Sequence, residues 1–168
     1  MSAPLERPAI VEAARNWIGT PYHHQASLRG VGCDCLGLVR GVWRDLCGPE
    51  PETPPPYTPE GCEGLGAEML AAAALRHLVP VAPGQERPGD VLLFRWRSHL
   101  PARHCAIFAA PDRIIHAHDG AQVAKGKPRL DLGVRRRGHS RVPVRRQVRR
   151  PFRDIEGEGQ RPLLAAQK

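Results

Sequence analysis

The sequence of 168 residues predicts an α+β domain in which helices precede an antiparallel sheet. Apolar residues in the first half recur at helical spacing. From Val91 onward, short apolar runs are separated by turn residues such as Pro111-Asp112, which is typical of strands. Helices first and strands later is an order that favours segregated α and β layers. A chain of this length can bury a core of its own, so we expect one domain.

Three helices are expected, over residues 8–18, 35–46 and 65–79. The middle helix has the clearest boundaries, because Asp34 is a good N-cap and Gly48 a good stop signal. Glycines at 37 and 41 lie four residues apart on this helix. Each glycine costs about 1 kcal/mol of helix propensity, so the pair predicts close packing against another element.

Strands are expected over residues 91–96, 104–109 and 113–117, with weaker signals at Val123, 130–134 and 142–148. Residues 49–59 contain six prolines and are expected to form an irregular surface connection. We place one domain at residues 1–153 and a solvated tail at residues 154–168.

The net charge of +8 is concentrated in one segment, because residues 125–153 contain 12 Lys and Arg and a single Asp. This segment is either a solubilising surface or a docking surface for an acidic protein or the anionic cell envelope. Few aromatic residues and no recognised nucleic-acid motif make nucleic acid an unlikely partner. No apolar run approaches 18 residues, which predicts no membrane span. The N-terminus lacks the apolar region of a signal peptide, so we expect cytoplasmic synthesis.

Five cysteines, an odd number, argue against a disulfide framework. No CxxC pair is present, so we expect no structural zinc and no cofactor. Cys35 at a helix start faces unpaired N–H groups and the positive end of the helix dipole, which favours a nucleophilic thiolate. The alternative is a small buried apolar residue. The sequence assigns no role to the remaining cysteines, Cys33, Cys47, Cys62 and Cys105.

Two histidines are expected near Cys35. His104 begins one predicted strand and His116 ends the next, and a short turn between antiparallel strands brings the two rings together. A helix packed on these strands would complete a thiolate, a general base and an imidazole that orients the base. Capping or surface roles are the alternative for each histidine. A metal site is a further alternative without diagnostic spacing, with His23, His24, His104, Cys105, His116 and His118 as its ligands.

Five short motifs follow one another in the chain: Gly19-Thr20-Pro21-Tyr22, Asp34-Cys35-Leu36-Gly37-Leu38-Val39, Pro88-Gly89-Asp90-Val91, His104-Cys105-Ala106-Ile107-Phe108 and Ile115-His116-Ala117. In this order and spacing, over roughly residues 8–125, the chain resembles the NlpC-type cysteine peptidases. These form the NlpC/p-sixty superfamily of bacterial cell-wall turnover. Single motifs are weak evidence, whereas five in order are strong.

The resemblance implies a papain-like α+β fold in which N-terminal helices pack on an antiparallel sheet. It implies Cys35 as nucleophile, His104 as base and His116 as the third, orienting residue. Tyr22 would help to hold the oxyanion or the substrate, or would only be a core ring. Asp34 would bind the amino terminus of the substrate, or would only cap the helix. The implied substrate is the peptidoglycan stem peptide. Within it, the resemblance favours cleavage of the bond between γ-D-glutamate and the diamino acid.

One residue departs from the common family pattern, because Leu36 follows the nucleophile where many members have serine. An apolar residue there resembles the peptidases of phage tails and phage-like gene transfer agents. This resemblance implies a tail-tip component with tail hub or tail-tip proteins as partners. It would be carried by a virion-like particle to the periplasm or cell wall of a target cell. The alternative is a structural tail-tip protein whose peptidase site has decayed.

Overall fold

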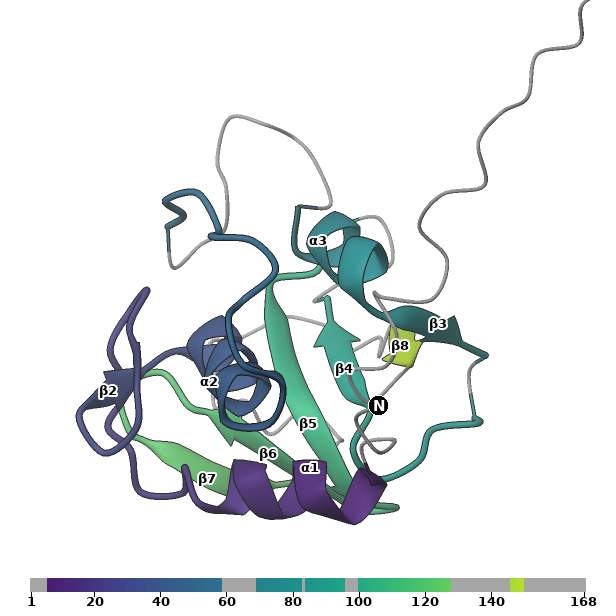
Figure 1. The fold of residues 1–168 in the computed structure, drawn as a ribbon, viewed down its shortest axis with the longest axis horizontal. Helices are drawn as coiled ribbons and strands as arrows, with labels where there is room; N and C mark the ends of the chain where they lie inside the picture. Colours follow the sequence, from purple (N-terminus) through teal and green to yellow (C-terminus); the bar gives the residue numbers. More distant parts are fainter. Residues whose placement is uncertain (1–5, 59–68, 83, 96–99, 128–145, 150–168) are drawn as a thin grey trace, which may run out of the picture.

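The computed structural model describes residues 6–58, 69–82, 84–95, 100–127 and 146–149, the last of these as backbone only (Figure 1). Three helices lie along a six-stranded sheet, and a small two-stranded sheet precedes the central helix. The helices are α1 (Arg7–Arg15), α2 (Cys35–Cys47) and α3 (Met69–His77). The strands are β1 (Ser27–Leu28), β2 (Gly32–Cys33), β3 (Val79–Val81), β4 (Val91–Phe94), β5 (His104–Ala110), β6 (Arg113–Ala117), β7 (Val123–Gly126) and β8 (Arg146–Arg149).

The large sheet has the order β3-β8-β4-β5-β6-β7, and all its neighbouring strands are antiparallel. Strands β4 to β7 form a meander in chain order, as the sequence predicted. Strand β8 comes from the C-terminal region and lies between β3 and β4. The predicted α+β class is therefore confirmed, with a connection in the sheet that the sequence did not indicate.

Most predicted elements occur close to their predicted bounds. The third helix ends at His77, so its predicted end at residue 79 was wrong, because Val79 already pairs with Arg149 in the sheet. The short strands β1, β2 and β3 were not predicted, and two of them contain only two residues. The predicted strand at residues 130–134, the first half of the one at 142–148 and the tail at 154–168 lie outside the described residues.

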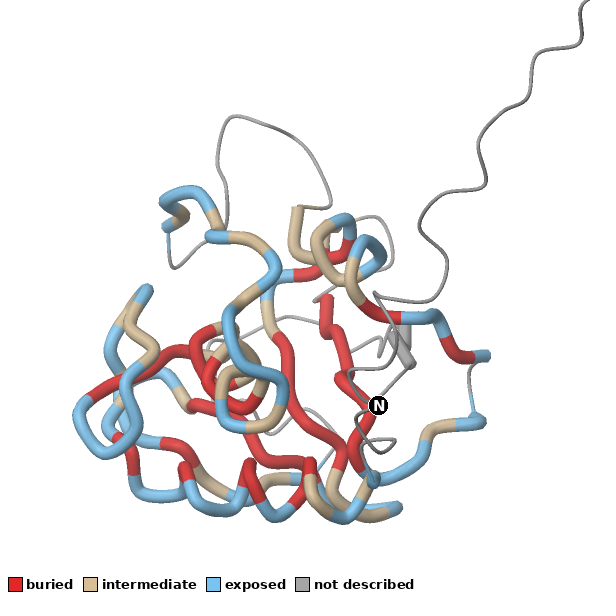
Figure 2. The backbone as a smooth tube through the Cα atoms, viewed as in Figure 1, coloured by how far each residue is buried: buried red, intermediate tan, exposed pale blue. Residues whose placement is uncertain are grey.

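Buried apolar residues pack between the helices and the sheet, and a further buried cluster of Leu92, Phe94, Ala106, Phe108 and Ile114 alternates with them along the strands. Figure 2 shows that buried residues run along α1, α2 and the central strands. Trp17 is 2% exposed there, and its indole N–H donates to Asp45 of α2 over 2.9 Å. The predicted close approach at Gly41 is confirmed, because a Cβ on Gly41 would come within 2.0 Å of the Trp17 ring. Glycine therefore lets α2 pack tightly on the chain that follows α1, which fixes α2 over the sheet.

The Pro88-Gly89-Asp90 turn is tied to α1 by a buried carboxylate. Asp90 is fully buried and accepts from the Arg7 guanidinium at 2.8 Å and from the Arg87 backbone N–H at 2.8 Å. Gly89 has φ of +92°, a conformation that favours glycine. The turn thus sets the start of β4, whose end faces the start of β5 through the pair Phe94–His104.

Candidate active site

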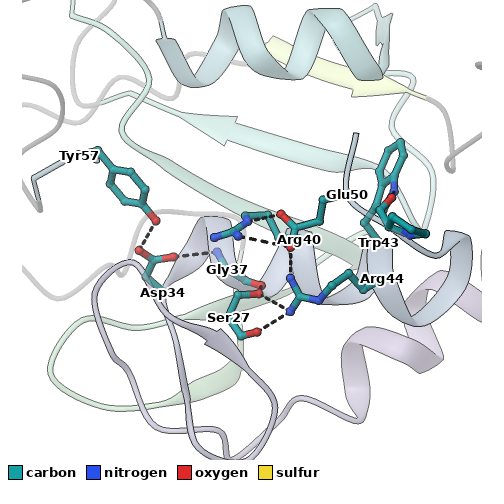
Figure 3. Close-up of polar contacts among 9 residues, drawn as sticks. Ser27, Asp34, Gly37, Arg40, Trp43, Arg44, Glu50 and Tyr57 are labelled. Carbon is teal, nitrogen blue, oxygen red and sulfur yellow. Dashed lines mark hydrogen bonds and ion pairs between the residues drawn. The ribbon is translucent and has the colours of Figure 1, made fainter. Parts of the chain in front are cut away.

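The buried side chain of Asp34 caps the N-terminus of α2 (Figure 3). Its Oδ1 accepts from the Gly37 backbone N–H at 2.7 Å, as expected of an N-cap. Its Oδ2 accepts from the Gln25 backbone N–H at 2.7 Å and from the Tyr57 hydroxyl at 2.5 Å. The capping role predicted for Asp34 is confirmed. All three hydrogen bonds come from the protein itself, so this carboxylate is engaged structurally.

Cys35 is the first residue of α2 and is partly exposed. Its pKa is held well below the ordinary value, foremost because the Cys105 thiol donates a hydrogen bond to its sulfur. The charge of His104 and a hydrogen bond to its ring lower the pKa further, and burial opposes them. A position at a helix N-terminus favours the thiolate in the same direction.

His104 and His116 meet at the edge of β5 and β6. Their ring centroids are 5.3 Å apart and the rings are perpendicular. Nε2 of His104 and Nδ1 of His116 are buried and have no hydrogen-bond partner among the described residues. An N–H on one ring and a lone pair on the other would satisfy both nitrogens. The structure therefore brings together the three predicted side chains, with His104 between the thiol and the second imidazole.

His116 is buried, and its pKa is lowered to about 4. Burial is the largest cause, and the nearby rings of His104 and His118 add to it. The ring is therefore neutral at pH 7. Gly126 on β7 makes room for it, because a Cβ there would lie 2.8 Å from Nε2. These features make His116 a neutral ring held in one place beside the base.

A cavity of about 810 Å³ borders His116 on the β6–β7 hairpin. Its described lining includes three cationic side chains, Arg113, Lys125 and Lys127, together with the ring of His118. No Asp or Glu belongs to the described lining. The cavity is therefore suited to a ligand that carries a negative charge.

Tyr22 lies next to the nucleophile, because it forms an isolated parallel bridge with Cys33, two residues before Cys35. The pKa of its hydroxyl is raised by burial and then by the charge of Cys35. The hydroxyl therefore remains protonated and can donate a hydrogen bond. The ring also packs against the core, so both predicted roles of Tyr22 remain compatible with its position.

Sequence reasoning missed Tyr57, which lies in the proline-rich connection and reaches Asp34. Its backbone oxygen accepts from the Gln25 side chain at 2.5 Å and contacts Nε2 of His24 at 2.7 Å. Burial and the charge of Asp34 raise the pKa of the Tyr57 hydroxyl. The one sequence feature that could have indicated this role is a tyrosine among prolines. The pattern does not show which residue it contacts, because Asp34 lies 23 residues away in the chain.

Glu50 anchors the other end of this connection to α2. Its carboxylate pairs with the guanidinium groups of Arg40 and Arg44, and Arg44 also donates to the backbone oxygen of Ser27 (Figure 3). These contacts lower the pKa of Glu50, although burial opposes them. The connection from residue 49 to residue 58 is thus held at both ends against the start and middle of α2.

The metal alternative finds no support in the arrangement of the described residues. Within them, no group of three or more His, Cys, Asp or Glu side chains is placed to hold a metal ion. His24, one proposed ligand, instead packs its ring on Tyr57 with centroids 5.1 Å apart. None of the helices in the described part of the chain has the length and apolar character needed to cross a membrane.

Comparison with solved structures identifies the fold. The NlpC/P60 domain of the peptidoglycan hydrolase SagA is 24% identical with a TM-score of 0.57, over 87% of this chain and all of that one. An NlpC/P60 family protein from Bacillus cereus has a TM-score of 0.59 at 15% identity, over 89% of this chain and 41% of that one. The peptidoglycan hydrolase RipB from Mycobacterium tuberculosis has a TM-score of 0.52 at 16% identity, over 88% and 65%. The chain has the NlpC/P60 fold, which confirms the predicted fold class.

At the level of sequence, the gamma-DL-glutamyl hydrolase of Bacillus subtilis (strain 168) is 31% identical over 114 residues, which is 68% of this chain. The chain spans about a quarter, 24%, of the length of this curated relative. No protein-family model matches the chain. The sequence similarity is therefore confined to part of this relative, and the NlpC/P60 fold rests on the solved structures.

The titration of His116 gives a first prediction. Lowering the pH from 7 to 4 should reduce the free energy of unfolding of the unaltered protein by about 3 kcal/mol more than that of His116→Asn. The folded pKa near 4 lies below the unfolded value of 6.5, so the unfolded state binds the extra proton between these values. Stability is present above pH 6.5 and is lost as the pH falls towards 4. Denaturant titrations at both pH values measure the difference.

The matched control is His23→Asn, since His23 is an exposed histidine. It should keep the pH dependence of the unaltered protein. If His116→Asn showed the same loss on acidification as the unaltered protein, His116 would not be the buried neutral ring described above.

Proposed function

We propose that the chain is a cysteine peptidase that cleaves an amide bond in peptidoglycan stem peptides. This proposal depends on the arrangement of three side chains. The thiol of Cys35 lies at a helix N-terminus, and its pKa is lowered in part by a hydrogen bond with His104. The ring of His104 lies beside the neutral ring of His116. This is the geometry of an activated nucleophile with an oriented base. The names of SagA and RipB, both called peptidoglycan hydrolases, support the choice of substrate.

The proposed reaction is acyl transfer through a thioester. Nδ1 of His104 takes the proton of the Cys35 thiol, and the thiolate attacks the carbonyl carbon of the amide. The backbone N–H of Cys35 and the Tyr22 hydroxyl stabilise the oxyanion. His104 then protonates the leaving amine as the carbon–nitrogen bond breaks. Water attacks the thioester after losing a proton to His104, which releases the acid and restores the thiol.

In this mechanism His116 positions the base. Its neutral ring can accept a hydrogen bond from the Nε2–H of His104, which fixes the tautomer with Nδ1 facing the sulfur. The positive charge that forms on His104 is then stabilised by an oriented dipole. A charged ring at this place would repel the charged base, so the low pKa of His116 suits the role.

The choice of stem peptides as the substrate is supported by charge complementarity. Stem peptides carry carboxylates, and the cavity beside His116 is lined by three cations. The bond that follows γ-D-glutamate is our first choice, in line with the name of the gamma-DL-glutamyl hydrolase. Asp34 is engaged by three hydrogen bonds within the protein, which favours helix capping over a role in binding the amino terminus of the substrate.

Cys35→Ala should abolish cleavage of purified peptidoglycan, with products identified by mass spectrometry, and should leave folding intact. His104→Ala should lose as much, since residues that act as one unit are not additive. His116→Asn should lose less, because the Asn side-chain oxygen can still accept a hydrogen bond from the ring N–H of His104. The matched control is Cys47→Ala, which changes an exposed thiol at the far end of α2 and should keep full turnover.

Two outcomes would contradict this proposal. Full turnover by Cys35→Ala would show that Cys35 is not the nucleophile. Stem peptides that stay intact while the unaltered protein binds them would favour the structural tail-tip protein with a decayed site.

We further propose that the protein acts at the tip of a phage-type tail, as the apolar Leu36 and the basic segment of residues 125–153 suggest. Changing Arg135, Arg136 and Arg137 to Gln avoids strand β8 and removes three positive charges. Incorporation into particles, or adsorption to whole cell walls, should fall, while cleavage of a small soluble stem peptide should be unchanged. Adsorption of the unaltered protein should weaken as salt increases.

A matched triple variant, Arg15→Gln with Arg29→Gln and Arg87→Gln, removes the same charge from exposed positions elsewhere. It should dock normally. Equal docking by both triple variants and the unaltered protein would mean that the basic segment is only a solvated surface.

A further inference from the structure

A second thiol packs in the same apolar cluster as the candidate nucleophile. Cys105 follows His104 on β5 and is 1% exposed, and Cys35 packs against the cluster of buried residues to which it belongs. Cys105 is the foremost cause of the lowered pKa of Cys35, and Cys35 in turn raises the pKa of Cys105. The cluster formed by α2, α3 and the sheet therefore contains two neighbouring thiols, one of which has the character of a thiolate.

The proposed peptidase reaction does not use Cys105, since His104 supplies every proton transfer. A thiolate with a neighbouring thiol has a different chemistry available to it. Oxidants convert a thiolate to a sulfenic acid, and a sulfenic acid condenses with a neighbouring thiol to form a disulfide. Susceptibility to the first step follows thiolate character and exposure, and Cys35 has both.

The other described cysteines are poorly placed to take this role. Cys33 is fully buried and belongs to a different apolar cluster, the one that contains Trp17. Cys47 ends α2, and the 12 residues that separate it from Cys35 correspond to about 18 Å along the helix. Among the cysteines that the structure describes, Cys105 is the one that shares an apolar cluster with Cys35 and is the foremost cause of its lowered pKa.

We propose that Cys105 is the resolving thiol of a reversible redox switch that acts on Cys35, with hydrogen peroxide as the oxidant. This inference rests on the proposed function only in that the oxidised thiol is the proposed nucleophile. The disulfide would withdraw the nucleophile from catalysis and protect it from irreversible oxidation. Reduction by a thiol would restore it.

The chemistry has two steps. The Cys35 thiolate attacks one oxygen of the peroxide, the O–O bond breaks, and a sulfenic acid and hydroxide form. The Cys105 sulfur then attacks the Cys35 sulfur, the S–O bond breaks, and the departing hydroxide leaves as water with the Cys105 proton. One thiolate, one thiol and one peroxide thus give one disulfide, one water and one hydroxide. Both sulfurs are oxidised and the peroxide is reduced.

The test combines disulfide mapping with recovery of activity. After treatment with hydrogen peroxide, the full chain is digested with a protease that cleaves before aspartate. Cleavage before Asp34 and Asp45 isolates Cys35 in peptide 34–44, away from Cys33. Cleavage before Asp90 and Asp112 isolates Cys105 in peptide 90–111. We expect these two peptides to be joined, most of the peptidase activity to be lost, and dithiothreitol to restore it.

Cys105→Val removes the resolving thiol and keeps a similar volume. In this variant Cys35 should proceed to sulfinic and sulfonic acids, and dithiothreitol should restore little of the activity that the variant had before oxidation. Cys105→Ser is a second variant, should valine disturb the packing, and thermal unfolding reports the folding of both. Cys47→Ala should behave as the unaltered protein does.

The mapping separates this inference from the proposed function. A joined pair of peptides in a protein without turnover would support the thiol pair and overturn the peptidase. Turnover by the untreated protein, together with Cys35 oxidised to sulfinic acid or joined to another cysteine after peroxide treatment, would overturn the switch and leave the peptidase standing. Equal recovery by Cys105→Val and the unaltered protein would also overturn the switch.

Discussion

The buried carboxylate of Asp34 fixes the start of α2, and with it the position of Cys35. Asp34 is 1% exposed, and an unsatisfied carboxylate at such a place would cost several kcal/mol. Three short hydrogen bonds from Gly37, Gln25 and Tyr57 remove this penalty. They come from the helix itself, from the loop before it and from the connection after it. One side chain thus joins three segments around the thiol.

The sheet supplies the second half of the site independently. Strands β5 and β6 pair with Ile107 opposite Ile115, and the ring centroids of His104 and His116 lie 5.3 Å apart on these two strands. Gly126 on β7 leaves space for the ring of His116, because the Cβ of any larger residue would collide with this ring. Close packing of α2, made possible by Gly41, then brings the thiol to the sheet. The site therefore depends on backbone approach at glycines as much as on the polar residues.

Local signals predicted most of the fold. The N-cap, the stop glycine and the helical spacing defined α2, and the turn residues defined β4 to β7. The position of β8 between β3 and β4 could not be predicted, because pairing between strands distant in the chain leaves no local pattern in the sequence. Strands of two residues, such as β1, are too short to produce a periodic signal.

For the candidate site, the motifs indicated Cys35, His104 and His116, and the structure places them together. The contribution of Tyr57 was not predictable, since it arises from a proline-rich connection that folds back on α2. The packing of Cys105 in the same apolar cluster as Cys35 was also missed. Alternation along a strand indicates which face a residue occupies, but not which atom of a helix will meet it.

The most direct test of this account is the pH dependence of the alkylation of Cys35 by iodoacetamide, followed by mass spectrometry of peptide 34–44. The account predicts that the alkylation rate stays high well below pH 8, because the thiolate is stabilised by its contacts at the start of α2. Cys47 lies on the surface, and partial burial of its sulfur raises its pKa, so it serves as an internal reference and should lose reactivity at a higher pH than Cys35. A Cys35 rate that falls off around pH 8.5, as for an ordinary thiol, would contradict the assignment of an activated nucleophile.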